Sequence, residues 1–168
     1  MGKARLMILI SHRGNHNGKN PDLENSPGYI DRAISRGYDV EVDLRRINGS
    51  CILGHDKPQY DVSEKWLNKR TKNLWLHCKN IAAVEWLSSI GGFNYFWHES
   101  DVLTLTSNNH IWAYPGRQSI KNSIAVLPEI HHDDVSKCIG ICSDYISLYR
   151  SNSQISLILK NKQSLNKS

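Results

Sequence analysis

The chain has 168 residues, of which 39% are hydrophobic and 22% are charged, and its formal net charge is +5. These values are typical of one globular domain with a buried core, and no apolar run approaches the length that crosses a bilayer, so stable membrane insertion is not expected. The basic residues are scattered instead of being arranged in stripes with aromatic residues, which argues against nucleic-acid binding. The small positive net charge is consistent with weak attraction of an anionic substrate.

The four cysteines are Cys51, Cys78, Cys138 and Cys142. They form no CxxC pair, which argues against a zinc ribbon or a thioredoxin-like site. Three of them lie in apolar segments that are typical of strands, where a thiol behaves as a small buried hydrophobic group. A reducing compartment suits this pattern better than a disulfide framework, and no targeting signal is evident, so we predict a cytoplasmic location.

The first half of the chain alternates short strands with short helices. Residues Asp39–Leu44 alternate acidic and apolar side chains, which predicts a strand with one apolar face and one acidic face. The turn at Asn48 and Gly49 predicts a hairpin that leads into Cys51–Leu53, and Ser63 is a candidate helix cap. The predicted strands are Leu6–Ser11, Asp39–Leu44, Cys51–Leu53 and Leu74–Cys78, and the predicted helices are Asp31–Arg36, Ser63–Asn68 and Ile81–Ser88.

The second half contains five more predicted strands, separated by connections that are too short for full helices. They are Asn94–His98, Val102–Thr106, Ile111–Tyr114, Ser123–Leu127 and Cys138–Cys142. Strands that alternate with helices indicate an α/β fold with a parallel sheet. A (β/α)₈ barrel normally needs roughly 250 residues, so we predict an abbreviated TIM-type barrel over residues 1–149, with several outer helices short or missing. Residues 150–168 form a polar tail that is predicted to be partly disordered or a short helix.

Three groups of ionisable residues follow or end apolar strands. They are His12-Arg13-Gly14, the pair Glu41 and Asp43, and His55-Asp56. In a parallel barrel, reactive groups gather at the C-terminal ends of the strands. A histidine at a strand end is more often an ordinary surface residue, and a Glu-x-Asp pair is more often a solvated face. Here the acidic face would point into the barrel, where unpaired charge is costly, and a bound cation would remove that cost.

The order and spacing of these groups resemble the glycerophosphodiester phosphodiesterase family, within the phospholipase-C-like superfamily. The similarity is dense over the first half of the chain and thinner beyond it. Its segments are Ile10-Ser11-His12-Arg13-Gly14, Leu23-Glu24-Asn25-Ser26, Ala33-Ile34, Val40-Glu41-Val42-Asp43-Leu44-Arg45, Leu53-Gly54-His55-Asp56, Leu76-His77-Cys78-Lys79 and Gly140-Ile141-Cys142-Ser143-Asp144. The chain looks like an unusually short branch of that family.

The resemblance implies a hydrolase for a small-molecule phosphodiester, with His12 and His55 as general acid and base. It also implies that Glu24, Glu41 and Asp43 bind a divalent cation, Mg²⁺ or Ca²⁺. In such enzymes the attacking group is the substrate's own neighbouring hydroxyl, and a cyclic phosphate forms before water completes the reaction.

Two further residues follow from the same comparison. Arg13 and Lys79 are implied to hold phosphate oxygens, a role that suits the planar fork of arginine and the point charge of lysine. His77 stands where the family has a carboxylate, so it is a tentative metal ligand. Because imidazole is neutral and softer than a carboxylate, it would weaken cation binding or favour a transition metal.

The second half of the chain adds pocket candidates. Trp97, Trp112 and Tyr114 are equally consistent with core packing and with lining a pocket, and Glu129 follows a strand end from which it could reach the site. Two alternatives to a glycerophosphodiesterase stay open. One is a non-catalytic module that binds phosphate esters on a decayed barrel, and the other is a lipid phosphodiesterase similar to sphingomyelinase D. Nothing in the sequence specifies an oligomeric state or a pathway in lipid metabolism.

Overall fold

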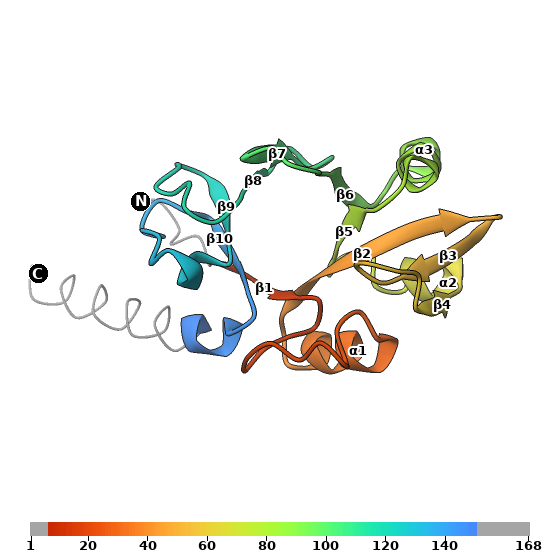
Figure 1. Ribbon diagram of the computed structural model, residues 1–168, viewed down its shortest axis with the longest axis horizontal. Coiled ribbons are helices and arrows are strands. Elements are labelled where there is room, and N and C mark those ends of the chain that lie inside the picture. The colour runs from red at the N-terminus through yellow and green to blue at the C-terminus, as the bar shows by residue number, and fades with distance from the viewer. Residues whose placement is uncertain (1–6, 151–168) are drawn as a thin grey trace, which may run out of the picture.

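The computed structural model describes residues 7–150, and its ten strands form one mixed sheet that curls into a half-barrel (Figure 1). The strands are β1 (Ile8–His12), β2 (Asp39–Ile47), β3 (Ser50–Leu53), β4 (Tyr60–Val62), β5 (Leu74–Cys78), β6 (Asn94–Trp97), β7 (Leu103–Leu105), β8 (Ile111–Ala113), β9 (Ser123–Val126) and β10 (Gly140–Ser143). The labelled helices are α1 (Pro27–Ser35), α2 (Glu64–Asn68), α3 (Ile81–Ile90) and the 3₁₀ turn η1 (Pro128–Ile130), and residues 146–150 are also helical. Almost every predicted element is present, while β4 and η1 were not expected.

Seven strands run parallel in the order β6-β5-β2-β1-β10-β9-β8. Their C-terminal ends therefore lie along one edge of the curled sheet. The remaining strands are antiparallel: β3 and β4 extend β2 outward as a hairpin, and β7 folds back on β8. The predicted turn at Asn48 and Gly49 is confirmed by the pairing of Ile47 with Ser50.

The predicted (β/α)₈ TIM-type barrel is wrong. After β6, the described chain has no α-helix before residue 146, which lies beyond β10, and the connection from β9 to β10 carries only η1. The turn between β7 and β8 is closed by a hydrogen bond from the Thr106 backbone to His110, and a turn this tight permits only antiparallel pairing. No strand ladder joins β6 to β7. These edges are linked by hydrogen bonds between Tyr95 and Ser107 and from Thr104 Oγ1 to the Trp97 carbonyl.

The alternation that was predicted for β2 is confirmed and separates core from site. Val40, Val42 and Leu44 are fully buried on the outer face, in a cluster that also holds residues of α1 and α3. Glu41 and Asp43 point to the inner face, as expected from the twofold period of a strand. One part of the core therefore lies between the sheet and its helices on this side. A second buried cluster, which holds Ile10, Trp75 and Trp112, packs on the concave side, and the polar groups lie there at the strand ends.

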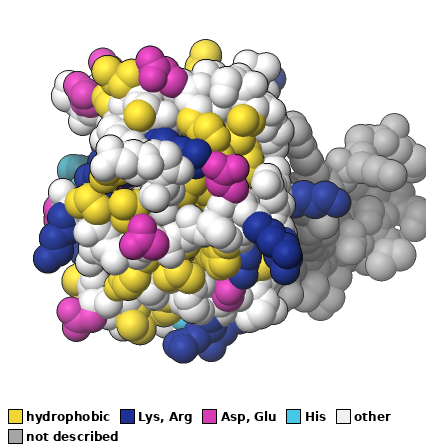
Figure 2. Space-filling view, turned by 90° about the vertical axis from the view of Figure 1, so that its right-hand side faces the viewer, with side chains coloured by type: hydrophobic (Ala, Val, Ile, Leu, Met, Phe, Trp, Pro, Cys, Tyr) yellow, Lys and Arg dark blue, Asp and Glu magenta, His cyan; other side chains and the backbone are white. Residues whose placement is uncertain are grey.

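The face over α3 and the β2–β3 hairpin carries charges of both signs among hydrophobic side chains (Figure 2). No basic stripe is visible on it, in agreement with the scattered distribution in the sequence. No helix within residues 7–150 is long and apolar enough to span a membrane. The predicted polar tail lies outside the described residues, except for Arg150.

Candidate active site

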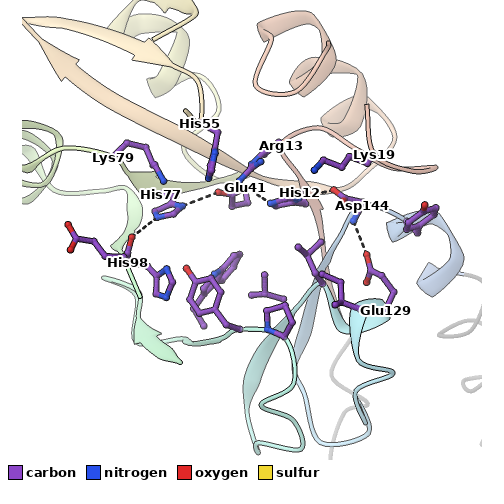
Figure 3. A pocket seen from close by; sticks show the side chains of 18 residues that line it. His12, Arg13, Lys19, Glu41, His55, His77, Lys79, His98, Glu129 and Asp144 are labelled. Carbon is purple, nitrogen blue, oxygen red and sulfur yellow. Dashed lines mark hydrogen bonds and ion pairs between the residues drawn. The ribbon is translucent and has the colours of Figure 1, made fainter. Parts of the chain in front are cut away.

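A pocket of about 610 Å³ opens at the edge where the parallel strands end (Figure 3). It brings together residues that follow or end six different strands, as well as the loop after β3. The predicted residues His12, Arg13, Glu41, His55, His77 and Lys79 all line it, and so do Trp112, Tyr114 and Glu129. These predicted residues therefore lie together at one end of the sheet, as in a barrel, although the sheet is not a (β/α)₈ barrel.

His12 ends β1 and is held by a carboxylate from β10. Its Nδ1 lies 2.7 Å from Asp144 Oδ1, and its Nε2 lies 3.8 Å from Glu41 Oε2. Burial disfavours the charged imidazole, but the hydrogen bond with Asp144 and the charge of Glu41 outweigh it and raise the pKa of His12. Since Asp144 fixes the Nδ1 side, Nε2 is the ring nitrogen that faces the pocket.

Glu41, Asp43 and His77 form the group of possible metal ligands in the described chain. One donor atom of each lies within 4.8 Å of the others, and all three residues are buried. Glu41 Oε2 and Asp43 Oδ1 are buried oxygens that accept no well-aligned hydrogen bond from the residues described. Leaving buried carboxylate oxygens short of well-aligned donors is costly, and a divalent cation would satisfy both, so this group fits a metal.

Without a metal, His77 interacts directly with the carboxylates of Glu41 and Asp43. His77 Nδ1 lies 3.2 Å from Asp43 Oδ1 and 3.7 Å from Glu41 Oε1. Burial lowers the pKa of His77, but its contacts with Asp43 and Glu41 prevail and raise it to about 9. Burial would raise the pKa of Asp43, yet His77 and Arg13 hold it well below its usual range. A proton on His77 thus supplies part of the positive charge that the two carboxylates require.

Glu24 lies outside this group, although the resemblance implied that it binds the cation. Arg13 Nη1 donates to Glu24 Oε2 at 3.2 Å, and Asn15 Nδ2 donates to Glu24 Oε1 at 2.9 Å. Arg13 also places its Nε 3.0 Å from Asp43 Oδ2. Glu24 therefore orients the Arg13 guanidinium here, and Arg13 spans the distance between Glu24 and the acidic pair.

Lys79 follows β5 on the same side of the pocket. Its Nζ lies 3.9 Å from Asp43 Oδ1, and its backbone nitrogen donates to Leu44 O. Arg13 and Lys79 thus approach the acidic pair from different strands, which gives the pocket two fixed cations next to the possible metal ligands (Figure 3). This arrangement suits an anion that also contacts a metal.

His55 lies on the loop after β3 and is more exposed than His12, with 37% of its side chain accessible. Its Nδ1 lies 2.6 Å from Asp56 Oδ1. Arg45 holds the loop in place by donating hydrogen bonds to the backbone carbonyls of Gly54 and His55. Gly54 has φ +142°, and a Cβ at this position would lie 2.2 Å from the Lys57 carbonyl, so only glycine fits the turn that presents His55.

Two polar residues of the site, Asp144 and Asn15, were not predicted to act in it. Asp144 ends the segment Gly140-Ile141-Cys142-Ser143-Asp144 that carries part of the resemblance, but neither residue had an assigned role. Asn15 is fully buried, and its amide donates to both Glu24 Oε1 and Asp144 Oδ1. Glu129 accepts hydrogen bonds from Ser143 Oγ and the Asp144 backbone, so it supports the Asp144 corner. Trp97 packs against the outer core and does not line the pocket.

Comparisons with protein-family models, with curated proteins and with solved structures found no match to this chain. The chemistry of the pocket therefore rests on its own geometry. Two imidazoles, each with Nδ1 paired to a carboxylate, can exchange protons through Nε2. Arg13, Lys79 and a possible metal site lie in the same pocket. Such positive groups can bind an anionic ester and stabilise the charge that develops when it is cleaved.

Proposed function

We propose that this protein is a metal-dependent phosphodiesterase that hydrolyses a glycerophosphodiester or a similar small phosphodiester. The observation that carries the proposal is the meeting of His12 and His55 in one pocket, each with Nδ1 on a carboxylate, beside Arg13 and Lys79. The resemblance of these motifs to glycerophosphodiester phosphodiesterases supports the same assignment. The buried free thiols support the further proposal of a cytoplasmic location.

Glu41, Asp43 and His77 would hold the cation, which is Mg²⁺, Ca²⁺ or, because of the imidazole, a transition metal. When bound, a divalent cation withdraws charge from the phosphoryl oxygens and favours attack at phosphorus. Arg13 and Lys79 would bind the remaining phosphate oxygens. Glu24 and Asn15 would keep the Arg13 guanidinium oriented toward the phosphate.

The two histidines would perform the proton transfers. Nε2 of one imidazole accepts the proton of the substrate hydroxyl next to the phosphate, while that oxygen attacks phosphorus. Nε2 of the other donates a proton to the departing alkoxide, which leaves as an alcohol. In the second stage the roles reverse, and water opens the resulting cyclic phosphate to a phosphomonoester.

The test is to assay the wild type against a panel of glycerophosphodiesters with Mg²⁺, Ca²⁺ and Mn²⁺. We expect a bell-shaped pH profile, and a loss of at least roughly a hundredfold in rate for His12→Ala and for His55→Ala. His131→Ala is the matched control, since His131 is exposed and does not line the pocket. Circular dichroism checks that each variant is folded.

Turnover that persists in both pocket variants would refute the mechanism. If the wild type binds phosphate esters but turns over none of them with any metal, the rival interpretation of a non-catalytic binding module is favoured instead.

A further inference from the structure

The pocket has two chemically different walls. Most charged groups come from β1, β2, β5 and the segments that follow β1, β3, β6 and β10, whereas β8, β9 and η1 supply the facing side of the curled sheet (Figures 1 and 3). That facing side is mostly apolar, and its polar groups are the Tyr114 hydroxyl and the Glu129 carboxylate. Its pocket-lining residues are Trp112, Tyr114, Pro115, Val126, Leu127, Glu129 and Ile130.

The one acid in this wall, Glu129, uses one carboxylate oxygen to support the Asp144 corner. Glu129 Oε1 accepts hydrogen bonds from Ser143 Oγ at 2.8 Å and from the Asp144 nitrogen at 3.3 Å. None of the seven residues is basic, so a phosphate placed here would find no counter-charge. The phosphate must therefore lie on the side of Arg13 and Lys79, and the rest of the substrate must face the apolar wall.

Large apolar side chains stay accessible where this wall meets the surface. Ile130 is 57% exposed and Tyr145, which also lines the pocket, is 43% exposed. The Tyr114 hydroxyl of this wall is buried, so the outer part of the wall presents the aliphatic groups of Pro115, Leu127 and Ile130. A hydroxylated alcohol placed against them would lose water without compensation. Apolar residues running from the pocket to solvent instead match an apolar ligand that extends out of the pocket.

The aromatic rings of the wall have little free surface to offer. Trp112 is 2% exposed, and Tyr114 stacks on His98 with ring centroids 3.5 Å apart. The accessible part of the wall is therefore largely aliphatic, formed by Pro115, Leu127 and Ile130. This composition favours a flexible hydrocarbon chain over a flat aromatic base.

We propose that one alcohol group of the substrate carries a hydrocarbon chain, which lies along the β8–β9 wall and leaves the pocket past Ile130. The inference rests on the proposed function, because it assigns the phosphate to the charged side of the same pocket. It narrows the substrate class to single-chain amphiphilic phosphodiesters, with the hydroxylated alcohol group next to His12 and His55.

The probes are alkylphosphocholines with butyl, hexyl and octyl chains, below their micelle concentrations. They are phosphodiesters without a hydroxyl beside the phosphate, so the proposed mechanism cannot cleave them, and calorimetry measures binding alone. We expect the affinity to rise about two- to fourfold for each added methylene, since a buried methylene contributes roughly 0.8 kcal/mol. Hexyl glucoside, which has the chain but no phosphate, should bind at least tenfold more weakly than hexylphosphocholine.

Two variants test the location of the chain. Ile130→Ser and Leu127→Asn should each flatten the dependence on chain length while leaving the affinity for glycerophosphocholine unchanged. Leu127 has φ +44°, a conformation that asparagine tolerates better than leucine, so the second variant should keep the backbone. Ile90→Ser is the control, because Ile90 is an equally accessible apolar residue at the end of α3 and does not line the pocket.

The outcomes separate this inference from the proposed activity. Equal affinity across the chain lengths, or an equal gain in Ile130→Ser and the wild type, overturns the inference even if glycerophosphodiesters are hydrolysed. A chain-length dependence that Ile130→Ser and Leu127→Asn abolish upholds the inference even if no diester is turned over, and the proposed hydrolysis alone then fails.

Discussion

The pairing of His12 with Asp144 offers the most direct probe of the proposed chemistry, through Asp144→Asn. The substitution removes a charge and keeps the shape. An amide oxygen at the Oδ1 position can still accept hydrogen bonds from His12 Nδ1 and Asn15 Nδ2, which lie 2.7 and 2.8 Å from it. The imidazole should therefore stay in place, and the variant isolates the electrostatic contribution of the carboxylate.

The size of the effect follows from the kind of bond that is lost. A hydrogen bond to a charged group contributes about 1.5–3 kcal/mol and a neutral one about 0.5–1.5 kcal/mol, so the loss is on the order of 1–2 kcal/mol. Because 1.36 kcal/mol corresponds to a tenfold change in rate, we expect kcat to fall roughly five- to thirtyfold. Asp144 raises the pKa of His12 in the wild type, so the limb of the pH profile that reports His12 should move to lower pH.

The assay is the pH dependence of kcat and kcat/KM for the best glycerophosphodiester found for the wild type. Asp134→Asn is the matched control, since Asp134 is exposed and its carboxylate accepts only from the Ser136 backbone among the contacts described. If Asp144→Asn is folded and keeps both the wild-type rate and the wild-type pH profile, Asp144 does not orient or charge a catalytic histidine, and the reasoning fails.

Three other perturbations address the cation, the His55 loop and pH. Glu41→Gln should weaken cation binding at least roughly tenfold by calorimetry, whereas Glu85→Gln on exposed α3 should not. Arg45→Ala should lower kcat/KM about ten- to a hundredfold with cation affinity unchanged, because the loop loses two hydrogen bonds, while Arg46→Ala should keep the activity. With a chelator present, the raised pKa of His77 stabilises the folded state, fully below pH 6.5 and less as the pH rises through about 9. Urea unfolding at several pH values should show this loss of stability, and the His77→Gln variant should lack it.

Local patterns predicted most of the secondary structure, because they depend on neighbours in the chain. The twofold alternation in β2, the Asn48-Gly49 turn and the Ser63 cap are each short-range signals, and each is confirmed. The convergence of strand ends was also predictable, since it follows from parallel pairing. At the start of α3, Ile81 is 67% exposed although it is apolar, because the helix turns Ala83 and Leu87 inward instead.

The closure of the sheet and the partners within the site could not be predicted in this way. Whether a parallel sheet becomes a (β/α)₈ barrel depends on crossover helices, and the connections after β6 do not supply them. Asp144 and Asn15 lie 129 residues apart in the chain, and only the pairing of β1 with β10 brings them into contact. The partners of Glu24 could not be predicted for a related reason, because nothing local indicated that Arg13 and Asn15 would donate to its two oxygens.

The charge balance of the site suits a histidine at position 77, where the glycerophosphodiester phosphodiesterases that the sequence resembles have a carboxylate. Without a cation, the charges of Glu41 and Asp43 are offset by Arg13 and by a protonated His77, each close to a carboxylate oxygen. A third carboxylate would leave the metal-free pocket with uncompensated buried charge, whereas His77 makes it nearly neutral. Cation binding would then require the loss of the His77 proton, so the affinity for the cation should fall as the pH is lowered. A histidine at this position thus lowers the affinity for the cation and stabilises the metal-free fold. The same proton distinguishes this pocket from an all-carboxylate site, which would release fewer protons when it binds its metal at neutral pH.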